Sequence, residues 1–556
     1  MNLVEVTITE NENILLNMIK EFRQTCAECP TKKPVRVVGG WVRDRLLGIR
    51  SHDIDIALED CTGEKFAHQF ESWLRGREEV GAGLIRTIVV KANPEKSKHL
   101  ETAMMSISSL NMEVDFVNLR SESYANDSRI PNTIHFGTPA EDAYRRDLTI
   151  NALFYNVDTK QIEDFTGVGM NDLRQGILRT PLDPVQTFMD DPLRVIRVVR
   201  FASKLPNTRC HDSVYQACNH SQVKLAIQQK ITKERIRQEL IKVFEYPSCL
   251  RAFELMHEWD LWQYVLLPTE HNFVAHRCAE ICTNICAAYN GVYHPVELLN
   301  EWSQFPIYVE RFMESVIRQD SRHDLLSKES GFYSKPYRSF EKKGVILMTS
   351  LLLNHFGYKC QVKNLCLSAT EDMLITLKSK NVATQVAVLS SIVEEWCVIL
   401  QKCESAEPSR EQLIRVLRAG GSDRYWEFAL IIAVLARVFK RDILPTLGPA
   451  RQVCANNRQR QLATLKSNTY DQAVQKILGI KQLVYNKYQL QGLWSMTPLL
   501  NGNEVMALLP PGTPSRVIGT YMGYQLDWIA AHWSPNEATR LNFVPALKDY
   551  LKNLPN

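Results

Sequence analysis

The chain has 556 residues, of which 45% are hydrophobic and 23% are charged. This composition is that of a globular protein of about three to four domains, and it excludes a wholly disordered, collagen-like or coiled-coil chain. The longest strongly apolar stretch, residues 428–436, is too short to span a bilayer, so we expect no membrane partner. The formal net charge of +4 permits nucleic-acid binding but does not argue for it.

The 14 cysteines are scattered without a regular framework, which predicts reduced thiols in an intracellular protein. Cys26 and Cys29 form the one Cys-x-x-Cys pair, and no second pair follows at the spacing of a zinc site. The N-terminus lacks the basic and apolar regions of a secretory signal. We therefore expect a cytoplasmic or nuclear protein, and a form that starts upstream of Met1 could also be mitochondrial.

Up to about residue 166, short runs of β-branched residues alternate with helical stretches, which predicts an α/β domain with a small mixed sheet. Strands are expected at 35–38, 54–58, 84–90, 112–119 and 150–157, and helices at 41–47 and 63–74. After about residue 172 the apolar residues recur at helical spacing, so an all-α remainder is expected. Its helices are predicted at 184–204, 233–245, 251–259, 277–289, 382–401, 410–417 and 425–438. The polar segment 322–342 is predicted to be a flexible insertion.

Two glycines, Gly39 and Gly40, stand between a predicted strand and a helix that starts near Trp41. Glycines at such a turn let the backbone approach a ligand closely and leave helix N–H groups free, as an anion site requires. Arg43, one turn into the helix, could add a charge-assisted donor for phosphate. Taken alone, this stretch is better explained as a plain Gly-Gly turn before a helix.

Two carboxylates, Asp53 and Asp55, occur two residues apart on the next predicted strand, so they share one face while Ile54 and Ile56 face the core. Such a pair is a ready set of oxygen ligands for Mg²⁺, and without a cation the two charges would repel each other. A solvated strand face is the alternative. Coming just after the Gly-Gly turn, the pair favours metal-phosphate chemistry.

A third acid, Asp115, lies on the polar face of the strand predicted at 112–119, together with Glu113. If this strand ran antiparallel to the first, Asp115 could join the metal ligands. Half-exposed strands often carry acids for solubility alone, so the identity of a third ligand stays open at this point.

The run G-G-x-V-R-D-x-L-L-G, from Gly39 to Gly48, followed by D-x-D at Asp53, resembles the nucleotidyltransferase superfamily. More narrowly, it is similar to the eukaryotic type of class II tRNA nucleotidyltransferases, the CCA-adding enzymes, and to the related bacterial poly(A) polymerases. Further motifs follow in the family's order: R-R-D-x-x-x-N-A from Arg145, a loose D-x-x-x-G at Asp164, D-D-P-L-R-V-I-R-V-V-R-F from Asp190, and T-K-E-R-I from Thr232. The family often has Glu where this chain has Asp190, but the second acid, Asp191, is kept.

The resemblance implies an α/β nucleotidyltransferase head at 1–170, a helical neck with a base-reading motif at 171–246, a helical body at 247–420 and a tRNA-binding helical tail at 421–556. It implies an enzyme that adds CMP and AMP, from CTP and ATP, to the 3′ end of tRNA without a template. The open alternatives are addition of only CC or only A, a poly(A) polymerase on the same head, and a non-catalytic RNA-binding protein. The intact Asp53/Asp55 pair argues against the last. The oligomeric state is left open.

The resemblance also assigns the site. Asp53 and Asp55 would be the catalytic carboxylates and hold Mg²⁺, with Asp115 as a further metal ligand. The nucleotide would be bound by Gly39, Gly40, Arg43, Arg145, Arg146, Asp147, Asn151, Asp191, Arg194, Arg197 and Arg200.

Within this set, Asp191 and Arg194 are suited to reading bases, because a carboxylate only accepts hydrogen bonds and a guanidinium only donates them. Cytosine and adenine present an amine donor beside a ring-nitrogen acceptor, whereas uracil and guanine present the reverse pattern. Arg194, Arg197 and Arg200 recur every three residues, and the valines and isoleucine between them predict that this cationic stripe faces a cleft or water.

Overall fold

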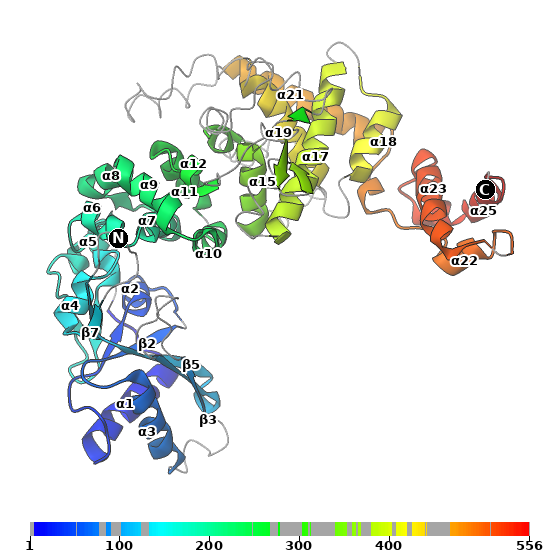
Figure 1. Cartoon of the computed structure of the whole chain (residues 1–556). Coiled ribbons are helices and arrows are strands. Elements are labelled where there is room, and N and C mark those ends of the chain that lie inside the picture. The colour runs from blue at the N-terminus through cyan, green and yellow to red at the C-terminus, as the bar shows by residue number, and fades with distance from the viewer. Residues whose placement is uncertain are drawn as a thin grey trace. The chain divides into compact units, whose positions relative to one another are not determined.

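The computed structural model describes residues 5–51, 53–76, 85–90, 102–123, 133–246, 248–266, 276–277, 303–309, 312, 340–352, 358–362, 365–368, 380–402, 407–419, 425–439, 441, 467–511 and 513–554. The chain forms two compact units, Met1–Val265 and Leu266–Asn556, which are described separately (Figure 1). The four-region division expected from the sequence stays a prediction. None of the described helices is long and apolar enough to cross a membrane.

A mixed sheet forms the head of the first unit, and its described strands follow the order β3-β4-β5-β2-β1-β8-β9. The strands are β1 Arg36–Val38, β2 Ile54–Leu58, β3 Ile85–Val90, β4 Thr102–Ile107, β5 Met112–Asn118, β8 Phe154–Asn156 and β9 Ile162–Glu163. β2 and β5 are parallel, and the other neighbours are antiparallel. The expectation that β5 runs antiparallel to β2 was therefore wrong. The reason is β4, which pairs antiparallel with both β3 and β5 and so returns the chain in the direction of β2.

Helices α1 Glu10–Thr25 and α3 Gly63–Arg75 lie beside the sheet (Figure 1). Aromatic side chains fill the space between these elements. The Phe66 ring lies 5.4 Å from that of Phe22 on α1 and 5.2 Å from that of Phe116 on β5. Gly63 allows the close approach, because a Cβ there would lie 2.2 Å from the carbonyl oxygen of Phe116. The apolar face of α3 is thus locked against the strand that carries Asp115.

The first helix is tied to the helix after the Gly-Gly turn, α2 Gly40–Leu46, by one buried carboxylate. Glu12 is 3% exposed, accepts from Trp41 Nε1 at 2.9 Å and forms an ion pair with Arg45. Its other oxygen accepts from the backbone N–H of Thr9 at 2.8 Å, which completes a capping box. Burial alone would raise the pKa of Glu12, but the donors from Trp41, Thr9 and Arg45 outweigh it and lower that pKa.

Short helices and two small ladders follow the sheet in the first unit. They are β6 Arg120–Ser123, β7 Thr133–Phe136, α4 Pro139–Tyr144, η4 Thr149–Asn151, α5 Gly169–Gln175, β10 Ile177–Leu178, α6 Pro184–Asp190, α7 Leu193–Lys204, β11 Arg209–Cys210, α8 Asp212–Asn219, α9 Ser221–Lys230, α10 Lys233–Phe244, α11 Cys249–Glu258 and α12 Trp262–Leu266. The single helix predicted at 184–204 is two helices, because Pro192 lacks the N–H that would continue α6. The strand predicted at 150–157 begins as the turn η4 and is extended only in β8.

The second unit is mostly helical, as expected, but not wholly so. Its helices are α15 Phe340–Leu352, α17 Lys380–Lys402, α18 Arg410–Ala419, α19 Tyr425–Val438, α21 Ser467–Gln482, α22 Gly502–Met506, α23 Ile518–Ala531, α24 Glu537–Leu541 and α25 Val544–Lys552. A small sheet of β12 His276–Arg277, β13 Tyr358–Val362 and β14 Leu365–Ser368 corrects the all-α expectation. Residues 278–289 of a predicted helix and 322–339 of the predicted insertion lie outside the described residues.

Glu12→Ala should lower the free energy of unfolding by about 3–5 kcal/mol, because it leaves Arg45 buried without its carboxylate and Trp41 Nε1 without an acceptor. Denaturant titration followed by tryptophan fluorescence measures this. Glu10→Ala, an exposed acid on the same helix, is the matched control and should cost less than about 1 kcal/mol. Equal effects of the two changes would contradict the buried link.

Candidate active site

Gly39 ends strand β1 at the point where three elements of the head meet. Its φ of +79° and ψ of −139° lie in a region of backbone conformation that residues other than glycine rarely adopt. A Cβ at Gly39 would lie 3.4 Å from Asp55 Oδ2 and 3.5 Å from Arg146 Nη1. The structure therefore brings together the Gly-Gly turn, one of the predicted metal carboxylates and one of the predicted phosphate-binding arginines.

The three predicted metal carboxylates gather at one end of the central strands. In the sheet register Asp55 stands beside Val38 on one side and beside Asp115 on the other, and Asp53 immediately precedes β2. Burial raises the pKa of Asp55 to about 6, with further contributions from Asp115 and Asp53, and Arg146 opposes the shift. The pKa of Asp115 is raised by burial, Asp53 and Glu113.

Oxygen donors that repel one another are the ligand set that a hard divalent cation favours, so the residues fit such an ion. Among the described residues, no three His, Cys, Asp or Glu side chains are gathered closely enough to form a finished metal site. The metal role of Asp53 and Asp55, and Asp115 as a further ligand, thus stay predictions. The pairing of Asp55 with Asp115 is what the strand geometry adds.

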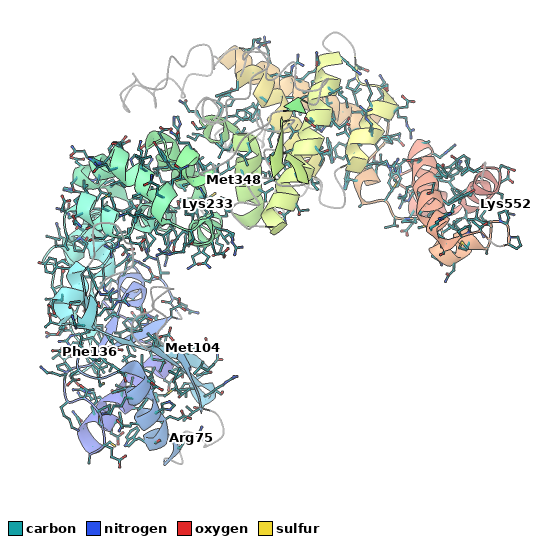
Figure 2. All side chains as sticks on the ribbon, in the orientation of Figure 1. Arg75, Met104, Phe136, Lys233, Met348 and Lys552 are labelled. Atoms are coloured by element: carbon teal, nitrogen blue, oxygen red, sulfur yellow. The ribbon has the colours of Figure 1, made fainter. Side chains whose placement is uncertain are left out.

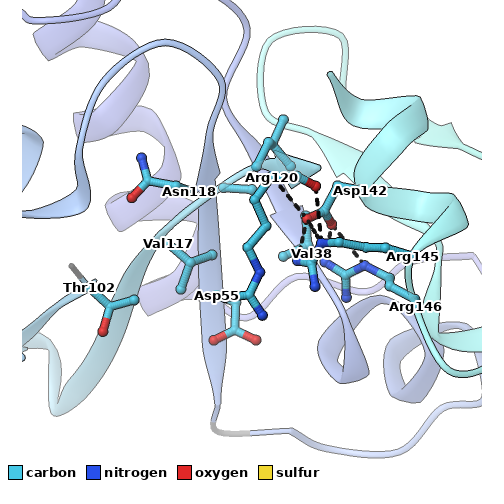
Figure 3. A pocket seen from close by; sticks show the side chains of 11 residues that line it. Val38, Asp55, Thr102, Val117, Asn118, Arg120, Asp142, Arg145 and Arg146 are labelled. Carbon is cyan, nitrogen blue, oxygen red and sulfur yellow. Dashed lines mark hydrogen bonds and ion pairs between the residues drawn. The ribbon is translucent and has the colours of Figure 1, made fainter. Parts of the chain in front are cut away.

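A pocket of about 270 Å³ opens beside Asp55 (Figure 3). Its lining residues are Val38, Asp55, Ala57, Thr102, Val117, Asn118, Leu119, Arg120, Asp142, Arg145 and Arg146. Three arginines and two carboxylates give the lining an excess of positive charge. A pocket of this charge next to the acidic strand can accept the phosphates of a nucleotide.

Asp142, on α4, holds the two arginines of the R-R-D motif in place. Its carboxylate is 1% exposed and accepts from Arg145 Nε at 2.8 Å and from Arg146 Nη2 at 2.7 Å (Figure 3). Burial alone would raise the pKa of Asp142, but Arg146 and Arg145 hold it below its usual value. Asp142 is not among the site residues predicted from the sequence. Its position three and four residues before the arginines, a helical spacing, could have indicated it.

Arg43 does not project into this pocket. It is 2% exposed, donates to Asn151 Oδ1, pairs with Asp44 at 2.7 Å and lies 5.0 Å from the centre of the Phe201 ring. These contacts join α2 to η4 and α7. A phosphate contact by Arg43 stays a prediction, and all the partners that the structure describes are protein groups.

Asp147 is also surrounded by protein donors. Its oxygens accept from the backbone N–H of Leu148 at 2.8 Å, from Asn151 Nδ2 at 3.0 Å and from Arg197 Nε at 2.7 Å. Burial opposes ionisation, but Arg197 and Asn151 lower the pKa of Asp147 far below its usual range. Nucleotide contacts by Asp147, Asn151 and Arg197 remain predictions.

The cationic stripe of α7 is covered in part by protein: Arg200 is buried, which corrects the sequence expectation for this residue, whereas Arg194 and Arg197 are half-buried. Arg200 is 8% exposed and donates to Glu239 on α10, and Arg197 lies 3.6 Å from the same carboxylate. The stripe finds acidic partners because α10 packs directly on α7. A helix periodicity reveals which residues share a face, but not what covers that face.

The predicted base-reading residues stand at the start of α7. Asp191 Oδ1 accepts from the backbone N–H of Leu193, the first residue of α7, at 3.2 Å, while Pro192 between them is the N-cap of this helix. Its carboxylate also binds Arg235, with Nη2 at 2.8 Å from Oδ2, and this partner was not anticipated. Arg194 Nη2 donates to the carbonyl oxygen of Arg145 at 2.8 Å, which places the guanidinium next to the R-R-D motif.

The T-K-E-R-I motif begins α10. Lys233, labelled in Figure 2, donates to the carbonyl oxygens of Tyr264 at 3.2 Å and Val265 at 2.8 Å, and burial lowers its pKa to about 8. Arg235, two residues on, reaches Asp191. The motif thus connects the base-reading helix with α12.

Two sequence families match the N-terminal half of the chain. Residues 35–179 match the poly A polymerase head domain, and residues 227–272 match a probable RNA and SrmB-binding site of polymerase A. The chain is 39% identical over 320 residues to the mitochondrial CCA tRNA nucleotidyltransferase of Saccharomyces cerevisiae, covering 56% of this chain and 58% of that protein. It is 42% identical over 266 residues to the same enzyme of Candida glabrata, covering 47% and 49%.

Over about half of its length the chain is similar to CCA-adding tRNA nucleotidyltransferases. It spans about half the length of the curated relatives that it matches. A solved apo CCA-adding enzyme has the same fold, with a TM-score of 0.52, 18% identity, and 97% of this chain and 96% of that chain covered. A Thermotoga maritima CCA-adding enzyme complexed with tRNA gives a TM-score of 0.50 at 17% identity, covering 98% and 96%. These likenesses confirm a mixed-sheet head followed by a largely helical remainder.

Asp142→Asn should destabilise the first unit by about 1.5–3 kcal/mol at neutral pH, because Arg145 and Arg146 lose their shared charge. The pKa of Asp142 is lower in the folded state than its ordinary value of 3.8. Its contribution is therefore complete above that ordinary value and is lost as the pH falls through the lower folded-state value. Calorimetry should find parent and variant converging at acid pH. The exposed control Glu28→Gln should match the parent throughout, and a gap for Asp142→Asn that persists in acid would contradict this account.

Proposed function

We propose that this chain is a metal-dependent tRNA nucleotidyltransferase that adds CMP and AMP, from CTP and ATP, to the 3′ end of tRNA without a nucleic-acid template. The observation that carries the proposal is the convergence of Gly39, Asp55 and Arg146 beside an arginine-lined pocket. The names of the fungal relatives support the tRNA substrate. We also propose that the protein acts where tRNA is matured, in the cytosol or nucleus and, as those names indicate for the relatives, in mitochondria.

The head family generally uses a divalent metal, and we propose Mg²⁺ held by Asp53 and Asp55, with Asp115 as a further ligand. When bound, the metal would lower the pKa of the 3′-hydroxyl of tRNA and neutralise charge on the triphosphate. Gly39 and Gly40 leave the backbone bare so that phosphates can come close to these carboxylates. No protein side chain is needed as a dedicated base.

Arg145 and Arg146 would bind the triphosphate. Asp142 aims both guanidiniums, so their geometry is set before a nucleotide arrives. Arg146 also donates to the carbonyl oxygen of Asn151 at 3.2 Å, which fixes it against the turn that follows the motif. A guanidinium held in this way can donate two hydrogen bonds to a phosphate without changing its position.

Asp191 and Arg194 would read the base. A carboxylate offers about four lone-pair sites, and the structure describes three donors on Asp191, two on Oδ1 and one on Oδ2. Oδ2 can therefore still accept the amine of cytosine or adenine while the carboxylate stays paired with Arg235. Uracil and guanine would present a carbonyl to the same oxygen, and an unpaired buried polar group is costly.

The deciding experiment supplies tRNA that ends at the discriminator base, at the first C or at CC, together with labelled CTP or ATP. Product length is read at one-nucleotide resolution. The proposed enzyme adds two, one and no C residues, respectively, and then a single A to the CC end. A long A run on any RNA would indicate a poly(A) polymerase instead. A stop after CC, or addition of A only, would indicate a divided function.

Asp53→Ala and Asp55→Ala should each lower the rate of nucleotide addition at least about a hundredfold at saturating Mg²⁺ and leave tRNA affinity nearly unchanged. Both changes remove a carboxylate at strand β2 and leave the helical regions proposed to bind tRNA unaltered. Glu113→Ala, an exposed acid on the neighbouring strand, is the control and should keep most of the activity. Activity of either aspartate variant within tenfold of the parent would refute the metal assignment.

Asp191→Ala should reduce the preference for CTP and ATP over UTP and GTP by roughly tenfold to a hundredfold, since one charged contact is worth about 1.5–3 kcal/mol. The measurement is kcat/KM for the four nucleotides on a suitable tRNA. The control is Asp190→Ala, whose carboxylate accepts from Gln186 on its own helix at 2.7 Å. Because Asp191 also accepts a hydrogen bond from the first backbone N–H of α7, melting temperatures accompany the kinetics. An unchanged ratio with equal slowing of all four nucleotides would make Asp191 structural only.

A further inference from the structure

A continuous chain of ion pairs and hydrogen bonds runs past the ring of Phe201 on α7, and we call it the Phe201 circuit. Its head side runs from Asp44 to Arg43, then to Asn151 and Asp147. Asp147 passes to Arg197 on α7 at 2.7 Å. On the neck side, Glu239 of α10 pairs with both Arg197 and Arg200.

Lys204, the last residue of α7, is bound to Asp44 at the head end of the circuit. Its Nζ donates to Asp44 Oδ2 at 2.8 Å, across 160 residues of sequence. Inside the circuit, the guanidiniums of Arg43, Arg197 and Arg200 lie 5.0, 5.6 and 4.3 Å from the centre of the Phe201 ring. Phe201 itself is 4% exposed, so these cation–π contacts are largely shielded from water.

The residues of the circuit lie on the four elements whose relative placement the proposed reaction depends on. α2 follows Gly39 directly, and η4 lies next to the R-R-D motif. α7 begins one residue after Pro192 and carries Arg194, and α10 carries both Arg235 and Glu239. The catalytic turn and the base-reading end of α7 are therefore linked by directional contacts and not by apolar packing alone.

We propose that the Phe201 circuit fixes the tilt and register of α7 against the head, so that Arg43, Arg197, Arg200 and Glu239 set nucleotide selectivity as positioning residues. This role replaces the direct nucleotide contacts that the sequence predicted for the three arginines. This inference rests on the proposed function. Hydrogen-bonded ion pairs accept one relative placement of two helices, whereas apolar side chains tolerate sliding. A small shift of α7 would move Asp191 and Arg194 together, away from the edge of the base.

The test uses two changes outside the proposed nucleotide contacts. Glu239→Gln keeps the shape of the side chain but removes the charge shared by Arg197 and Arg200. Phe201→Leu keeps an apolar filling but removes the ring that faces three guanidiniums. The matched control is Glu234→Gln on the same helix, where the carboxylate pairs locally with Arg237. The full chain is assayed for kcat/KM with CTP, ATP, UTP and GTP on one tRNA.

Each circuit variant should lower the CTP-to-UTP ratio at least tenfold, mainly by raising relative incorporation of UTP, while the control stays within twofold. Partial unfolding lowers all four values together and leaves their ratio unchanged, so the ratio separates positioning from stability. An unchanged ratio in both variants would overturn the proposal. If the parent adds no nucleotide to tRNA, the proposed function fails, and the circuit is then judged by the ratio of Kd values for CTP and UTP. Equal Kd ratios in parent and variants would overturn the proposal in that case too.

Discussion

Repulsion between the carboxylates of Asp55 and Asp115, held side by side by two parallel strands, is the constraint on which the rest of the head depends. The backbone register holds the Cα positions of the two residues opposite each other. Nearby positive charge must offset the two carboxylates, and Arg146 provides part of it. Arg146 in turn needs Asp142, and Asp142 is buried because α4 returns against the sheet beside β6. The repulsion between two carboxylates in the sheet thus accounts for the arginine beside them and for the second carboxylate that holds this arginine.

Much of the fold was readable from local pattern. The isoleucines of β2 and the amphipathic run of α3 gave those elements nearly to the residue, because one face of each is buried. Strand β4 was missed, since its Ala-Met-Met centre carries no β-branched run and its pairing on both sides forms it. Direction was wrong for β5, because a strand's own sequence does not contain the path of the chain that leads to it.

The candidate site divides in the same way. Residues whose role depends on near neighbours in sequence, such as Asp53 with Asp55 or Asp191 with Arg194, could be grouped in advance. The burial of Arg43 could not, because its acceptor Asn151 is 108 residues away. Arg235 and Asp191 are 44 residues apart and belong to different helices, so their pairing follows from how α10 packs and not from any local spacing.

Helix α1 has a consequence for how the head can be divided from the rest of the chain. The match to the head-domain family starts at residue 35, after α1 has ended at Thr25. A fragment cut there would retain every nucleotidyltransferase motif and lose the only described acceptor of Trp41 Nε1, the carboxylate of Glu12. A fragment that keeps helix α2 with all its described contacts must therefore include α1 as well as the matched region. The segment that carries the motifs is shorter than the segment that folds as a unit.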